Sequence, residues 1–172
     1  MNKYQRITVV FLCLLMTTAV CAAQSVTDVI EAINDLDIKA LRKVNIVSEN
    51  QGNLVTLVLD VTNNNSRGLR LVDSQFDVLF NMRKVGAATI AKETFVSKQR
   101  RQVTLLMHNV PVSDVLYMIN VIGDPTTNRQ VTLVGTSEAE IEVNRGWFGE
   151  PGRRIKVELN YQPQFQREVL LD

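Results

Sequence analysis

Few side chains in this sequence combine the residue types and the spacing that catalysis requires. Asp73 and Asp77 stand four residues apart in an alternating segment. A strand would place both carboxylates on one face, roughly 13 Å apart, which is wider than the carboxylate pairs of glycoside hydrolases. His108 is the only histidine, and the sequence has no Gly-x-Ser-x-Gly motif. We therefore expect no catalytic residue and interpret the chain as a protein that is not an enzyme.

The clearest candidate ligands for a metal ion form an acidic ladder in one alternating segment, at Glu138, Glu140 and Glu142. Hard cations such as calcium take oxygen ligands, but they need several that converge on one point. Arg154 and Lys156 of the next predicted strand are placed to pair with these carboxylates across a sheet. We therefore expect ion pairs at this ladder, and neither a metal site nor a cofactor.

Residues 1–23 have the order of a secretory signal peptide, with basic residues first, then an apolar run at residues 7–15, then small residues. The apolar run is shorter than the about 20 residues that a membrane-spanning helix needs. We expect cleavage after Ala22 or Ala23 and export across the inner membrane, most simply to the periplasm. A lipoprotein acylated at Cys21 and a retained N-terminal helix are the alternatives.

Charge and cysteine content exclude further classes of function. The chain has 19 basic and 18 acidic residues, and removal of residues 1–23 takes away two basic ones, which leaves a net charge of −1. A near-neutral domain lacks the basic surface that nucleic acid requires, and the basic cluster at residues 98–101 is interpreted as a solvated turn. Both cysteines, Cys13 and Cys21, lie within the predicted signal peptide. The exported part would therefore have no disulfide and no cysteine-based zinc site.

Alternation of inward and outward side chains dominates the rest of the chain, as at Val55, Leu57, Leu59 and Val61. The pattern predicts strands near residues 41–46, 55–62, 69–80, 84–95, 102–108, 130–143 and 153–161, and a helix at residues 111–121. Seven short strands with turn signals between them predict an all-β fold, an antiparallel immunoglobulin- or fibronectin-III-like β-sandwich. The single short helix lies between strands five and six.

Two apolar faces are expected within these elements. In the third strand, Val72 is expected on the same face as Phe76, Val78 and Phe80. In the helix, the three- and four-residue spacing predicts one apolar side. Its members are Val112, Val115, Leu116 and Ile119.

The ends of the domain are less regular. Residues 24–40 form an N-terminal lead-in, either a short helix or a loosely packed segment, before a β-domain at residues 41–161. Residues 162–172 form a C-terminal tail that adds an edge strand or docks on a partner.

Trp147 and Phe148 are the candidate partner contact. They stand side by side in a glycine-flanked loop at residues 146–152, between the last two predicted strands. Paired aromatic side chains at a loop tip are typical of contacts with a protein or a membrane interface. The alternative is that both rings fold back and close one end of the sandwich.

Four segments together resemble the late embryogenesis abundant (LEA) type 2 family, whose domain is also named WHy, for water stress and hypersensitive response. They are residues 55–65 (VTLVLDVTNNN), 69–85 (LRLVDSQFDVLFNMRKV), 86–95 and 102–110. The resemblance extends over roughly residues 36–161. Asn63-Asn64 stands where the family usually has Asn-Pro, a change that keeps the turn chemistry.

The resemblance implies a sandwich fold and a non-enzymatic role in stress or desiccation tolerance, or in binding components of the cell envelope. The alternative is a partner-binding β-sandwich subunit of an envelope assembly. In either case the expected partner is a protein or a membrane surface. A hydrolase is the least favoured interpretation.

Overall fold

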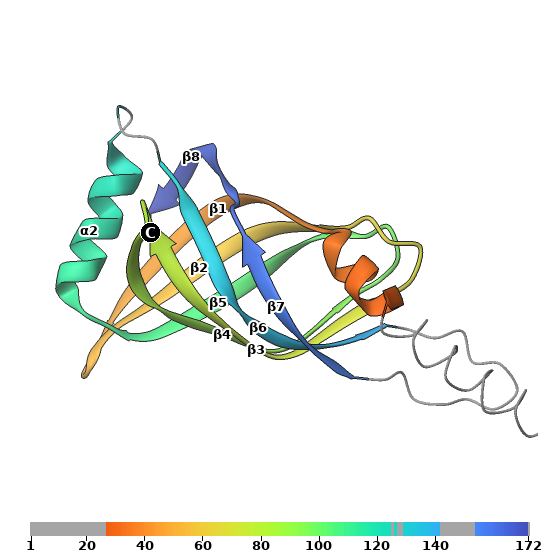
Figure 1. Ribbon diagram of the computed structural model, residues 1–172. Coiled ribbons are helices and arrows are strands. Elements are labelled where there is room, and N and C mark those ends of the chain that lie inside the picture. Colours follow the sequence, from red (N-terminus) through yellow and green to blue (C-terminus); the bar gives the residue numbers. More distant parts are fainter. Residues whose placement is uncertain (1–26, 125, 127–128, 142–153, 172) are drawn as a thin grey trace, which may run out of the picture.

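A computed structural model describes residues 27–124, 126, 129–141 and 154–171. Residues 27–34 form a short helix, and one further helix and eight strands follow (Figure 1). The elements are β1 (Leu36–Glu49), β2 (Gly52–Asn63), β3 (Leu69–Phe80), β4 (Arg83–Phe95), β5 (Arg100–Val110), α2 (Val112–Gly123), β6 (Val131–Ile141), β7 (Ile155–Tyr161) and β8 (Gln164–Leu171). The two helices lie at opposite ends of the molecule. Within the described residues, neither helix is long and apolar enough to cross a membrane.

The eight strands form one curled sheet in the order β7-β6-β3-β4-β5-β2-β1-β8. The all-β prediction is confirmed, but the prediction of a sandwich with about seven strands is not. Only Thr89 and Leu106 pair between β4 and β5, so the sheet consists of two four-strand halves with a narrow join. The alternation of side chains shows that a segment is a strand, but it does not show which other strand it pairs with. The sequence pattern therefore could not distinguish one curled sheet from a sandwich of two sheets.

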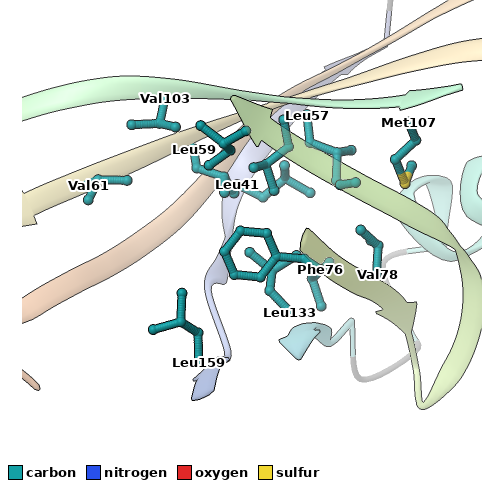
Figure 2. Close-up of a cluster of buried hydrophobic side chains, with 14 of the residues drawn as sticks. Leu41, Leu57, Leu59, Val61, Phe76, Val78, Val103, Met107, Leu133 and Leu159 are labelled. Atoms are coloured by element: carbon teal, nitrogen blue, oxygen red, sulfur yellow. The ribbon is translucent and has the colours of Figure 1, made fainter. Parts of the chain in front are cut away.

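Strand β2 forms because β-branched and leucine side chains alternate along it and are buried on one face. Val55, Leu57, Leu59 and Val61 are all buried. Figure 2 shows that the side chains of this half of the sheet meet Phe76 and Leu133 of the other half. The core therefore lies inside the curl of the sheet, between its two halves.

Strand β3 contains a bulge that changes which side chains are buried. Asp73 has a positive φ of 49°, and the register with β6 shifts between Val72 and Gln75. Because the bulge adds a residue, Leu71 and Phe76 both face the core, while Val72 is only half-buried. The expectation that Val72 shares the face of Phe76 is therefore wrong.

The segments that flank the predicted domain belong to the fold. Val29, Ala32 and Ile33 of the first helix are buried in the core, and β1 begins at Leu36, before the predicted boundary at residue 41. In the C-terminal tail, β8 pairs in parallel with β1 as an edge strand. The described domain therefore extends beyond residues 41–161 at both ends.

Helix α2 occupies the predicted place between β5 and β6. Its core-facing residues are Val115, Met118, Val121 and Ile122. Val112 is 63% exposed and Leu116 is 55% exposed, so the prediction that both lie on the apolar side is wrong. The core-facing residues extend to Ile122, and the helix ends at Gly123, two residues beyond the predicted end at residue 121.

Candidate functional site: the open seam of the sheet

The last two strands cross the gap between the two edges of the sheet. β7 pairs with β6 as far as Tyr161, which lies opposite Leu133. After Gln162 and Pro163, β8 pairs with β1 from Ala40 onward. Because consecutive strands attach to opposite edges, the curled sheet is drawn together at this crossover. On one side of the crossover, the outer edge of β7 faces the beginning of β1, and we call this gap the seam.

The seam contains a cleft of about 530 Å³. Residues 33–38 line one wall and residues 158–162 line the other, with Asn64 between them. β7 is the terminal strand of the sheet, so the outward N–H and C=O groups of its free edge have no strand partner among the described residues. Such an edge is a template for a further strand.

The polar side chains that line the cleft are acidic or neutral. They are the carboxylates of Asp35, Asp37 and Glu158 and the amides of Asn34, Asn64, Asn160 and Gln162. Lys39 pairs with Asp37 at 3.7 Å, but it does not line the cleft. The cleft therefore has a negative charge, which favours a cationic ligand over an anionic one.

Tyr161 lies where the cleft meets the core. It lines both the polar cleft and a small apolar pocket of the interior. Burial raises the pKa of Tyr161 to about 12, and its hydroxyl has no hydrogen-bond partner among the described residues. The hydroxyl is therefore protonated at neutral pH. The interior pocket measures about 10 Å³, room for no more than about one water, so this pocket does not hold a larger ligand.

Asn63 holds the loops beside the seam in place. Its fully buried amide donates to the carbonyl oxygens of Phe95 and Val96 and to that of Arg67, at 3.0 to 3.4 Å. Its Oδ1 accepts the Asn65 N–H at 3.0 Å. The next residue, Asn64, donates its N–H to the Asp35 carbonyl at 3.0 Å. The Asn63 side chain thus holds the two loops together, and the backbone bond of the next residue joins Asn64 to Asp35, both of which line the cleft.

A second group of charged residues lies on the outer face of the sheet. Asp60 of β2 accepts hydrogen bonds from Arg42 at 2.6 Å and from Arg100 at 3.0 Å. Burial alone would raise the pKa of Asp60, but the two guanidinium groups outweigh it and hold the pKa below its usual value of 3.8. Asp60 is therefore ionised throughout the neutral range.

The side chains that the sequence analysis considered for catalysis or for partner contact lie in separate places. Asp73 is exposed at the β3 bulge, whereas Asp77 is half-buried and pairs with Lys84 at 2.8 Å. His108 is exposed on β5. Trp147 and Phe148, the candidate partner contact, lie outside the described residues. No group of three or more histidine, cysteine or carboxylate side chains in the described ranges is placed to hold a metal ion.

The acidic ladder on β6 pairs with basic residues, as predicted, at one position. Glu140 lies 3.7 Å from Arg154 and also 3.5 Å from Arg70 of β3. Glu138 is opposite Lys156 in the register of β6 and β7. The third member, Glu142, lies outside the described residues.

Sequence reasoning missed the seam and the cluster around Asp60. The alternation in β2 placed Asp60 on the polar face, and the basic cluster at residues 98–101 included Arg100. Nothing local to either segment indicates that β5 lies beside β2 with Gln102 opposite Asp60. Arg42, on β1, gives no signal of its own.

Comparisons with known proteins add little. No protein-family model matches the chain, and no curated protein matches it. A crystal structure of a protein from Archaeoglobus fulgidus is similar over 76% of this chain and 99% of that chain, with 14% identity and a TM-score of 0.29. A similarity with such a low TM-score supports no conclusion about fold or function.

Proposed function

We propose that this chain is an exported, non-enzymatic domain of the LEA type 2 kind that binds an extended segment of a cell-envelope partner in the seam. The observation that carries the proposal is the free edge of β7, which borders a cleft of about 530 Å³ opposite the first residues of β1. An incoming strand would pair its backbone with β7, and its alternate side chains would enter the cleft.

Export and membership of the LEA type 2 family are parts of the same proposal. The order of residues 1–23 supports export, with a lipid anchor at Cys21 as the alternative form. The strand pattern of residues 36–161 supports the LEA type 2 assignment. We take the two four-strand halves of the sheet as counterparts of the two sandwich layers that this resemblance implies. A role in stress or desiccation tolerance rests on the resemblance alone.

The charge of the cleft specifies the segment further. Asp35, Asp37 and Glu158 line it, and no basic side chain of the described residues does. An extended segment with lysine or arginine at alternate positions therefore fits best, because those side chains point to the same face of a strand.

The test is a titration of the C-terminally tagged protein, purified as cells process it, with short alternating peptides followed by amide NMR. A valine–lysine peptide should shift resonances at residues 155–161 and 36–38, and a valine–glutamate peptide should not. The same basic peptide with N-methylated backbone amides should fail, because it cannot complete the strand pairing. Shifts that avoid the seam, or equal binding of both peptides, would overturn the proposal.

A matched pair of variants distinguishes the effect of the cleft's charge from the effect of any charge reversal on the protein surface. Glu158→Lys reverses a charge in the cleft and should weaken the basic peptide. Glu138→Lys makes the same change at an exposed position of β6 outside the cleft, and this variant should bind the peptide like the unmodified protein.

A further inference from the structure

The outer face of β2 carries a buried carboxylate where a solvated side chain is expected. Asp60 alternates with the buried side chains of Leu59 and Val61, so it points away from the core. Asp60 is nevertheless only 3% exposed. Its neighbours in the register are Ala40 of β1 and Gln102 of β5. Burial on this face therefore comes from the long side chains that reach over it, chiefly those of Arg42 and Arg100.

The two arginines are held close together by that carboxylate. Arg42 Nε and one Nη of Arg100 contact the same oxygen, Asp60 Oδ2, at 2.6 and 3.0 Å. The two nitrogens are therefore no more than 5.6 Å apart. Neither guanidinium has another hydrogen bond within the part of the chain that the structure describes, so each has donor groups left over.

The carboxylate of Asp60 and the two guanidinium groups differ in their exposure to solvent. The side chain of Asp60 is nearly inaccessible, whereas that of Arg42 is 37% exposed and that of Arg100 is 61% exposed. A solute at this face meets guanidinium groups and not the carboxylate. The carboxylate of Asp60 balances only one of the two guanidinium charges. The cluster therefore has a net positive charge.

We propose that Arg42 and Arg100 form a binding site for a phosphate-type oxyanion on the outer face of the sheet. Two guanidinium groups this close can donate to a single tetrahedral oxyanion, and the fork of donors on each arginine suits its geometry. The side chain of Asp60 brings the two arginines together, and its negative charge offsets one of their two positive charges. Inorganic phosphate and the phosphodiester headgroup of an anionic lipid share this chemistry. The site lies apart from the seam and does not depend on the function proposed there.

The first experiment distinguishes these two sources with the tagged protein, purified as cells process it. Inorganic phosphate is titrated at low ionic strength and followed by amide NMR at residues 40–43, 58–62 and 100–102. Sedimentation with phosphatidylglycerol vesicles is compared with that of phosphatidylcholine vesicles. Binding in either arm, lost in high salt, supports the proposal and assigns the source. Absence of binding in both arms overturns it.

Variants distinguish a binding site from a structural ion pair. Arg42→Gln and Arg100→Gln should each weaken anion binding by about tenfold, since each removes a charged donor. Arg83→Gln removes the same charge from an ion pair with Asp114 at the start of α2, and should leave binding unchanged.

The decisive variant is Asp60→Asn, which keeps the shape of the side chain and removes its charge. It should bind the anion more tightly than the unmodified protein, because both arginine charges are then uncompensated. Loss of folding cannot imitate an increase in affinity. Unchanged or weaker binding by folded Asp60→Asn, or equal loss in Arg83→Gln, would overturn the proposal.

Discussion

Strands β2 and β7 have similar alternating sequences but opposite surroundings. β2 pairs with β1 on one side and with β5 on the other, and its apolar side chains are buried. β7 pairs with β6 alone, and of its side chains only that of Leu159 is buried. One sheet therefore contains both a strand that is paired on both edges and buried, and a terminal strand with one unpaired edge among the described residues. The stability costs of matched substitutions in β2 and β7 measure how much each strand contributes to holding the fold.

The largest contrast is expected between Asn63→Ala in β2 and Asn160→Ala in β7. Asn63 is fully buried and bonds three carbonyl groups and one N–H, so its loss should destabilise the protein by about 3 kcal/mol. Asn160 is exposed, and its loss should cost no more than about 0.5 kcal/mol. Urea denaturation measures both values. Equal costs would show that the loops beside the seam do not depend on Asn63.

A smaller contrast is expected for the same apolar truncation in each strand. Val61→Ala removes buried methyl groups from the core side of β2 and should cost about 2 kcal/mol. Val157 of β7 is only half-buried, so Val157→Ala should cost less than about 1 kcal/mol. Denaturation midpoints at constant m-value give the comparison. A larger cost for Val157→Ala would mean that β7 is as deeply packed as β2.

The smallest effect is expected in the pH dependence of the protein's stability, to which Asp60 of β2 contributes. The pKa of Asp60 is lower in the folded protein than in the unfolded chain, because Arg42 and Arg100 outweigh the effect of burial. Its contribution to stability is therefore complete above the ordinary value of 3.8 and is lost as pH falls below it. Asp60→Asn should lack this acid-dependent loss. Denaturation curves that shift in parallel with pH for both proteins would contradict the assignment.

Local pattern predicted much of the fold. Strand β3 and helix α2 fall close to their expected places because alternation, helical spacing and the position of Pro111 are properties of short segments. The bulge at Asp73 was missed because a positive φ at an aspartate leaves no mark in the hydrophobic pattern. The single curled sheet was missed because it depends on one residue pair, Thr89 and Leu106, and the alternation within β4 and β5 does not show where these consecutive strands pair.

Neither candidate site could be predicted in the same way. The seam exists because β7 and β8 attach to opposite edges of the sheet, which is a property of topology. The Asp60 cluster requires Arg42, Asp60 and Arg100 to come from three strands. Each residue is ordinary within its own segment, and only the register brings the three together.

The most direct test of the central claim is amide hydrogen exchange of the free protein and of the protein saturated with the basic alternating peptide. In the free protein, β2 amides should exchange only through global unfolding, because both edges of the strand are bonded. Alternate amides of β7 should exchange rapidly and should become protected when the peptide binds. Uniform protection of β7 in the free protein, or protection by the peptide elsewhere alone, would contradict an open binding edge at the seam.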